Sequence, residues 1–191
     1  MKLHYRGKYD LNPDNLPHGE HKEGCVKFKE AEDSKKLAFW ANIAAFAIML
    51  VLAVPTCLRL EDRIFDHFLA IYLGIIVSML VLFPHEILHA ICFKEDVYLY
   101  TNWRQGMLFV IGPEDMSKGR FVFMSMLPNL VFGFLPYILG MIFASPFLLA
   151  LGTLTVGMGA GDYYNVFNAL TQMPKGARTY LYKFNSYWYM P

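Results

Sequence analysis

The chain has 191 residues, of which 55% are hydrophobic and only 17% are charged, and its net charge is +1. A soluble domain usually carries about 25% charged residues, so this composition argues against an ordinary soluble protein. The near-neutral charge argues against nucleic acid as a partner. The three cysteines lie far apart and are odd in number, which gives no disulfide framework.

Long stretches without charge divide the chain into expected membrane spans. From Phe121 to Gly161 there are 41 consecutive residues without Asp, Glu, Lys or Arg. Since one span needs about 20 apolar residues, this stretch holds two. We expect an all-α membrane protein with four transmembrane helices at about residues 37–58, 67–93, 121–144 and 146–170. The membrane domain 37–170 then follows a polar N-terminal segment, 1–36, and precedes an aromatic tail, 171–191.

The distribution of lysine and arginine predicts the orientation in the membrane. With four alternating spans, 15 of the 17 lysine and arginine residues fall on one side, in the N-terminal segment, the 94–120 loop and the tail. Positively charged residues are retained on the cytoplasmic side. We therefore expect a multi-pass protein of the cell membrane with both termini in the cytoplasm.

The 94–120 loop has a pattern of its own. The apolar stretches Val97–Tyr100 and Met107–Val110 flank the turn-like residues Asn102–Gly106, which predicts a β-hairpin. The hairpin could cap the membrane domain at the interface, or it could offer an edge strand to an extended substrate. The aromatic residues of the tail are typical of a belt at the membrane interface.

The sequence H-E-I-L-H at residues 85–89 carries the strongest chemical signal. Two histidines four residues apart lie on one face of a helix, one turn apart, and can bind a single zinc ion. Glu86 between them can act as general base on a zinc-bound water. The motif follows 17 residues without charge, Phe68 to Pro84. Ionisable groups at membrane depth are costly, so we interpret them as functional.

A catalytic zinc site usually has three protein ligands and one open position. Asp162 is the single charged residue of the expected fourth span and lies at a depth similar to that of His85. Cys92, one turn after His89, is a rival ligand, although a small reduced core residue explains it as well. Asn165, one turn beyond Asp162, could orient a ligand, bind substrate or make a plain interhelical hydrogen bond.

The N-terminal segment contains a second group of residue types that bind metals. His18, His21 and Cys25 could form a further metal site. Their spacing is loose, and a solvated loop explains them equally well.

The sequence H-E-I-L-H-A followed by an Asp in a later span resembles the site-2 protease class of intramembrane zinc metalloproteases. Within that class the chain is similar to small bacterial four-helix proteins described as putative zincin peptidases. The resemblance covers roughly Phe68 to Leu170. It departs at the third ligand, where the class has Leu-Asp-Gly and this chain has Gly161-Asp162-Tyr163. The resemblance implies a three-helix catalytic core with the active site inside the membrane, toward the cytoplasm.

We expect a zinc-dependent intramembrane metalloprotease that hydrolyses peptide bonds in or near the membrane. His85, His89 and Asp162 would hold Zn²⁺, and Glu86 would activate the water. The partners would be a membrane protein or peptide substrate and the lipid bilayer. Two alternatives stay open: a non-enzymatic membrane protein whose structural zinc is closed by a fourth ligand such as Cys92, and a zinc hydrolase of non-peptide amides or esters.

Overall fold

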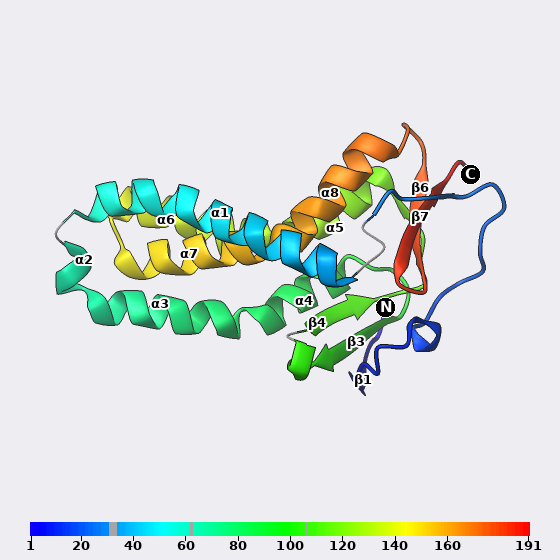
Figure 1. Ribbon diagram of the computed structural model, residues 1–191, viewed down its shortest axis with the longest axis horizontal. Helices are drawn as coiled ribbons and strands as arrows, with labels where there is room; N and C mark the ends of the chain where they lie inside the picture. Colours follow the sequence, from blue (N-terminus) through cyan, green and yellow to red (C-terminus); the bar gives the residue numbers. More distant parts are fainter. Residues whose placement is uncertain (31–33, 62, 106) are drawn as a thin grey trace. The chain divides into compact units, whose positions relative to one another are not determined.

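The computed structural model describes residues 1–30, 34–61, 63–105 and 107–191. Its helices are α1 (Ser34–Leu60), α2 (Arg63–Asp66), α3 (Phe68–Leu80), α4 (Leu82–Ile91), α5 (Lys118–Pro128), α6 (Leu135–Phe143), α7 (Pro146–Met158) and α8 (Ala160–Gln172) (Figure 1). Its strands are β1 (Leu3–Lys8), β2 (Val26–Lys27), β3 (Val97–Asn102), β4 (Met107–Ile111), β5 (Met116–Ser117), β6 (Arg178–Tyr182) and β7 (Asn185–Tyr189). The described part of the chain is therefore mostly helical, with β-sheet in addition.

The chain divides into two compact units. The sheet unit contains Met1–Glu30, Glu86–Ser125 and Asn165–Pro191. The bundle unit contains Ala31–His85 and Met126–Tyr164. Each unit is therefore built from stretches that are far apart in the sequence. Three of the boundaries between the two units fall within the helices α4, α5 and α8.

Within the bundle unit, α7 is the central helix and contacts α1, α3 and α6 (Figure 1). Glycines allow these helices to approach to backbone contact. A Cβ atom added at Gly152 would lie 2.5 Å from the backbone nitrogen of Tyr137, and one added at Gly74 would lie 2.6 Å from the carbonyl oxygen of Phe147. Small residues at such positions are typical of helices that associate in membranes, where close packing replaces the hydrophobic effect.

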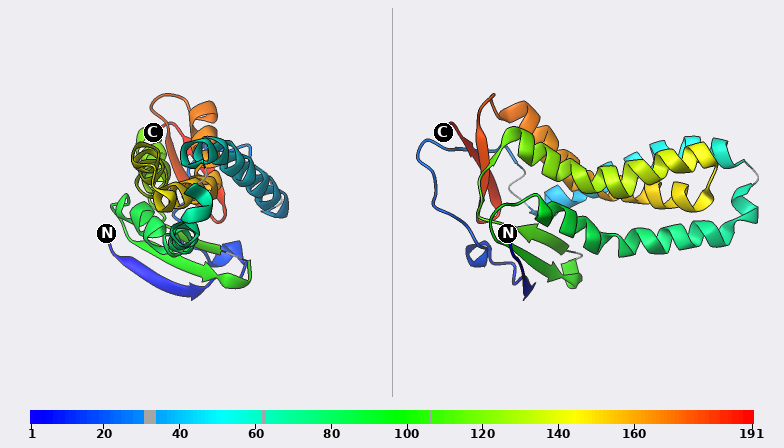
Figure 2. Two further views of the ribbon diagram at one scale, coloured as in Figure 1. Left: turned by 90° about the vertical axis from the view of Figure 1, so that its left-hand side faces the viewer. Right: turned by 180° about the vertical axis from the view of Figure 1, so that it is seen from behind.

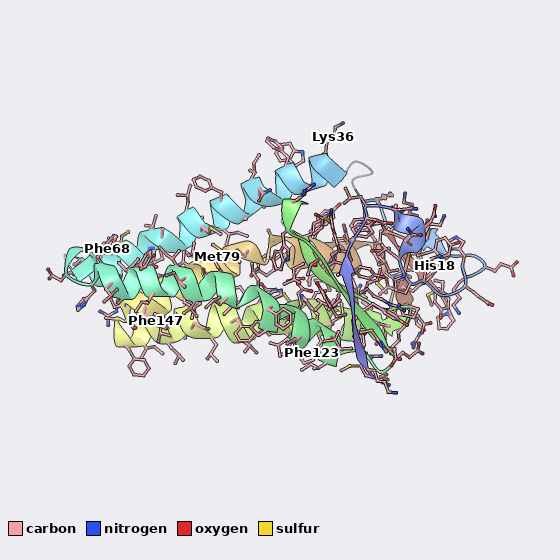
Figure 3. All side chains as sticks on the ribbon, turned by 90° about the horizontal axis from the view of Figure 1, so that it is seen from below. His18, Lys36, Phe68, Met79, Phe123 and Phe147 are labelled. Carbon is pink, nitrogen blue, oxygen red and sulfur yellow. The ribbon has the colours of Figure 1, made fainter. Side chains whose placement is uncertain are left out.

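Large apolar side chains cover the outer surface of the bundle unit. Val51 and Leu58 on α1 are 70% and 73% exposed, and Phe68 on α3 is 73% exposed. Figure 3 shows Phe68 and Met79 along α3. Such a surface would be costly in water, since exposed apolar patches of this extent are rare on soluble monomers. It suits a lipid environment.

Among the residues that the structure describes, two helices are long and apolar enough to cross a membrane. One is Phe39–Leu60 in α1, and the other is Lys118–Phe143, which runs through α5, a π-helical turn and α6 (Figure 2). The pair α3 and α4, bent by 43°, counts as a third if it forms one span. These helices indicate membrane association.

The expected fourth span is interrupted. The helix predicted at 146–170 is divided at Gly159: α7 ends at Met158, and α8 begins at Ala160. The Gly159 N–H closes the last turn of α7 by bonding to the carbonyl oxygens of Thr155 and Val156. With 13 residues, α7 is about 20 Å long at helical rise, shorter than a hydrocarbon core of about 30 Å. The architecture of four continuous transmembrane helices is therefore not confirmed.

The sheet unit contains two sheets. The first has the strand order β1-β3-β4, with β1 parallel to β3 and β3 antiparallel to β4. The pair β3–β4, in which Leu99 lies opposite Val110, confirms the predicted hairpin. A helical turn at Trp103–Gln105 follows β3, and Gly106 lies outside the described residues.

The second sheet was not expected from the sequence and makes the all-α description incomplete. Its strands have the order β2-β7-β6-β5 and are antiparallel throughout. It is built largely from the N-terminal segment and the aromatic tail. Tyr180 in β6 is only 5% exposed and stacks on Tyr187 of β7 with ring centroids 5.8 Å apart. At least these aromatic residues of the tail pack within a sheet.

Asp115, just before β5, links β6 and β7 of this sheet through hydrogen bonds to its carboxylate. Arg178 donates from Nε and Nη2 to the two carboxylate oxygens, at 3.1 and 3.0 Å. The Tyr189 hydroxyl donates to the same carboxylate. The bonds from Arg178, opposed by burial and assisted by Tyr189, hold the pKa of Asp115 below its usual range.

We predict that Gly152→Ala destabilises the bundle unit, because the new methyl group would meet the Tyr137 backbone and force α6 and α7 apart. Overpacking of this kind costs about 1–3 kcal/mol. The measurement is thermal unfolding of the detergent-solubilised full chain. Gly119→Ala is the matched control, since a Cβ atom at Gly119 in α5 meets nothing within 4 Å. Equal melting temperatures for the two variants would contradict the packing argument.

We also predict a pH-dependent role for Asp115. Its pKa is lowered in the folded state, so its stabilising contribution is complete well above the unfolded pKa of about 3.9 and is lost as the pH falls through the folded value. Asp115→Asn should therefore lower the melting temperature at pH 7 and progressively less below about pH 4. Asp66→Asn, which alters an exposed carboxylate of α2, is the control. If the melting temperature of Asp115→Asn differed from that of wild type by the same amount at every pH, the stabilising role of the ionised Asp115 carboxylate would be contradicted.

Candidate metal centre

Helix α4 presents the H-E-I-L-H motif directly after a bend. The 43° bend separates α3 from α4, and Pro84 lies in the first turn of α4. Proline has no N–H donor and its ring clashes with the carbonyl four residues earlier, which places the bend before this turn. One candidate ligand atom each from His85, Glu86 and His89 lie within 4.8 Å of one another on this helix. The spacing of the motif therefore brings the three groups together.

Asp162 contacts the first histidine of the motif. It lies in the first turn of α8, and its Oδ2 is 3.1 Å from Nε2 of His85. The side chains are only 15% and 13% exposed, respectively. Two atoms that bind one zinc ion tetrahedrally at about 2.0–2.1 Å lie about 3.3 Å apart. The contact thus has the spacing of neighbouring zinc ligands.

His89 is held by a backbone carbonyl. Its Nδ1 lies 2.9 Å from the carbonyl oxygen of Met124, and the residue is only 7% exposed. Because a carbonyl oxygen only accepts, Nδ1 carries the proton, which leaves Nε2 as the acceptor nitrogen of the neutral imidazole. Histidines that bind metals usually donate their second ring N–H in this manner. In this tautomer Nε2 could serve as a metal ligand.

The Glu86 carboxylate lies against the first sheet. Its Oε2 accepts a hydrogen bond from the Val110 N–H at 3.0 Å. Val110 belongs to β4, which is an edge strand in the described order β1-β3-β4. An N–H that bonds to Glu86 is directed away from β3. The residue expected to act as general base therefore lies at the outer edge of the predicted hairpin.

Asn129 also belongs to this centre, and the sequence interpretation missed it. Its Nδ2 donates to Oδ2 of Asp162 at 2.7 Å, and the residue is completely buried. It begins the π-helical turn Asn129–Phe134, and such turns occur frequently at functional sites. A signal was present, because Asn129 is the only Asn, Gln or His in the charge-free stretch from Phe121 to Gly161.

Arg120 anchors the C-terminal end of α4 and is itself paired with Glu114. Arg120 donates from Nε and Nη2 to the carbonyl oxygen of Cys92 at 3.0 and 2.6 Å, and from Nη1 to Glu114. Burial alone would raise the pKa of Glu114, but bonds from Arg120 and from the amides of Lys94 and Glu95 outweigh it and lower the pKa. A cation at a helix C-terminus is favourable to the helix dipole. The motif therefore sits on a helix whose end is fixed.

Two residues considered for the centre are not brought into it. The thiol of Cys92 donates to the carbonyl oxygen of Leu88 in its own helix, at 3.4 Å. Asn165 is half-buried on α8 and makes no side-chain hydrogen bond with any residue that the structure describes. The contact with His85 is made by Asp162, which we regarded from the sequence as the better third ligand.

The N-terminal group is only partly assembled. Cys25 Sγ lies 3.4 Å from Nε2 of His21, whose Nδ1 lies 3.2 Å from the Tyr180 hydroxyl. His18 instead packs against the ring of Tyr182, with ring centroids 4.7 Å apart. Among the described residues, only His85, Glu86 and His89 form a group of three with metal-ligand spacing.

The chemistry of the donors fits zinc. Two imidazole nitrogens and a carboxylate oxygen are a set found in catalytic zinc sites, with the fourth position open. His85 and His89 belong to the group on α4, and Asp162 contacts His85, so these three residues could supply such a set. Metal ligands are usually held by further hydrogen bonds. The carbonyl oxygen of Met124 bonds to His89, and the side-chain amide of Asn129 bonds to Asp162.

Comparison with known proteins supports the zincin part of the resemblance. A family described only as a protein of unknown function matches residues 21–85. No curated protein and no solved structure matches the chain. The main match covers residues 76–178, more than half of the 191 residues, and includes His85, Glu86, His89, Asn129 and Asp162. The chain therefore belongs to the family described as “Putative zincin peptidase”.

Proposed function

We propose that the chain is a zinc-dependent metalloendopeptidase that hydrolyses peptide bonds in or near the membrane. The observation that carries this proposal is the 3.1 Å contact of Asp162 with His85, next to the group formed by His85, Glu86 and His89 on α4. Membership of a zincin family supports the peptidase activity and the zinc requirement. The two or three apolar helices support the membrane setting.

In this proposal His85, His89 and Asp162 hold the zinc ion. Zinc, when bound, supplies a Lewis acid that polarises the scissile carbonyl and lowers the pKa of a water molecule toward about 7. Glu86 is the general base. Its carboxylate accepts a proton from the attacking water and returns it to the departing amine, a contribution typically of about 10²–10⁴-fold.

The substrate in this proposal is a membrane protein or peptide that reaches the site in extended form. The Val110 N–H that bonds to Glu86 belongs to the outer edge of β4. An extended segment can pair with such an edge through its main chain. It would then place its backbone next to the general base. A helical substrate must unwind locally, because its carbonyls are otherwise hydrogen-bonded. The position of Glu86 favours this role of the hairpin over simple capping.

We further propose a site-2 protease-like arrangement with four membrane passes, of which α7 and α8 form a broken fourth. Interrupted helices are tolerated at membrane depth where they line a polar site, and Asp162 lies directly after the interruption. The asymmetric distribution of lysine and arginine supports cytoplasmic termini.

The two alternative functions have less support. A structural zinc site would need a fourth protein ligand, and the Cys92 thiol instead bonds to the Leu88 carbonyl of its own helix. A hydrolase of non-peptide amides or esters could use the same zinc chemistry. However, only a peptide backbone can pair along the edge of β4, so the position of Glu86 favours a peptide substrate.

We predict that the purified full chain contains about one zinc ion, as expected for a catalytic site with three protein ligands. The zinc should be lost from His85→Ala, His89→Ala and Asp162→Ala, because each change removes one ligand. Cys92→Ala should retain it. The measurement is zinc content by inductively coupled plasma mass spectrometry after gel filtration in detergent. Retention of zinc by Asp162→Ala together with its loss from Cys92→Ala would reverse the assignment.

We predict that Glu86→Gln keeps its zinc but loses peptidase activity by about 10²–10⁴-fold, because the amide cannot accept the proton. The measurement compares membrane-derived peptides from cells that express wild type or Glu86→Gln. Peptides that depend on the wild-type chain identify substrates as well as activity. Glu95→Gln, which changes an exposed carboxylate, is the matched control and should behave as wild type. Identical peptides from Glu86→Gln and wild-type cells would refute the catalytic role.

A further inference from the structure

We propose that Asn129 is a positioning residue, which holds the carboxylate of Asp162 in the orientation that binds zinc. This inference rests on the proposed function of the metal centre. It adds a residue that belongs neither to the H-E-I-L-H motif nor to the helix of the third ligand.

The direct contact is a charge-assisted hydrogen bond. Nδ2 of Asn129 lies 2.7 Å from Oδ2 of Asp162, and the same oxygen lies 3.1 Å from Nε2 of His85. If the amide were reversed, its oxygen would face a carboxylate oxygen at this distance, and two acceptors would repel each other. The amide nitrogen therefore faces Asp162. Bonds of this type are short, directional and strengthened by burial.

The opposite side of the amide is closely packed. Oδ1 of Asn129 lies 3.3 Å from the Tyr163 hydroxyl, which in turn lies 2.9 Å from the carbonyl oxygen of Val156. A Cβ atom added at Gly159 would lie only 1.8 Å from Oδ1. The Asn129 amide thus occupies space that only a glycine at position 159 leaves open. It cannot turn without disturbing the end of α7.

The backbone around Asn129 departs from regular helix geometry at the same point. The π-helical turn begins at Asn129, and the Leu135 N–H bonds to the carbonyl oxygen of Leu130, five residues earlier. A wider turn changes the direction in which the adjoining side chains project. Asn129 is 0% exposed, so its amide does not form hydrogen bonds with bulk solvent. A wider turn that begins at a residue bonded to Asp162 supports a positioning function.

The test uses the full chain in detergent and zinc alone as the probe, with the dissociation constant measured by competition with a chelator. Asn129→Asp keeps the shape of the side chain and replaces its donor by an acceptor, whereas Asn129→Ala removes both. We expect both variants to bind zinc about 10–100-fold more weakly, as is typical when an outer hydrogen bond to a ligand is lost. We also expect the visible absorption of bound Co²⁺ to change, which altered stability alone would not produce.

A second variant reaches the same amide without changing a polar group. Gly159→Ala should displace Asn129 through its new methyl group and weaken zinc binding in the same direction. The matched control is Asn168→Ala. Asn168 is another buried asparagine, 5% exposed, whose Oδ1 accepts a bond from Gln172 in α8. Its zinc affinity and Co²⁺ spectrum should equal those of wild type.

Wild-type zinc affinity and Co²⁺ spectra in both Asn129 variants would overturn the inference. If Asp162→Ala lost its zinc in the same experiment, the proposed function would stand. Retention of zinc by Asp162→Ala would instead mean that the proposed ligand set itself is wrong. Equal weakening in Asn168→Ala would show that loss of a buried amide acts through general stability, and would also overturn the positioning role.

Discussion

The contact between His85 and Asp162 is the constraint around which the bundle unit is arranged. The two residues are 77 positions apart in the sequence, yet their side chains lie 3.1 Å apart and are largely shielded from solvent. A buried ionisable group without a partner costs several kcal/mol, so neither residue is tolerable alone in an apolar helix. Each lies near the start of a helix that follows an interruption. The interruptions at the start of α4 and α8 allow the two side chains to meet.

Three departures from regular helix geometry surround one carboxylate. The bend before α4, the π-helical turn at Asn129 and the break at Gly159 all adjoin residues that contact Asp162 or stand beside it. In an unbroken helix each side chain projects at a fixed angle from the next, which limits where a ligand can point. Interruptions remove this limit but shorten the apolar helices. The break between α7 and α8 and the contact of Asp162 with His85 are therefore consequences of the same feature.

Local patterns in the sequence predicted α1 and the hairpin β3–β4, because their residues pair within one short segment. The parallel pair β1–β3 could not be predicted in this way, since Leu3 lies opposite Val97 and no local pattern encodes such a pairing. The hairpin β6–β7 did carry a signal, because aromatic residues, which favour strands, lie on both sides of a two-residue connection. In the structure Lys183 in this turn has a positive φ of 57°. Assigning those aromatic residues to a membrane interface concealed it.

Part of the candidate metal centre could be chosen from the sequence by looking for histidines and charged residues in apolar stretches. His85, Glu86 and His89 form a local motif, and Asp162 was selected because it is the one charge in an apolar stretch. The same physical criterion applies to amides, since an unsatisfied amide at membrane depth is also costly. Asn129 meets it, whereas Cys92 does not, because its thiol is satisfied by the carbonyl of its own helix. In apolar segments, a need for a partner from another helix is therefore a better guide to the site than ligand type alone.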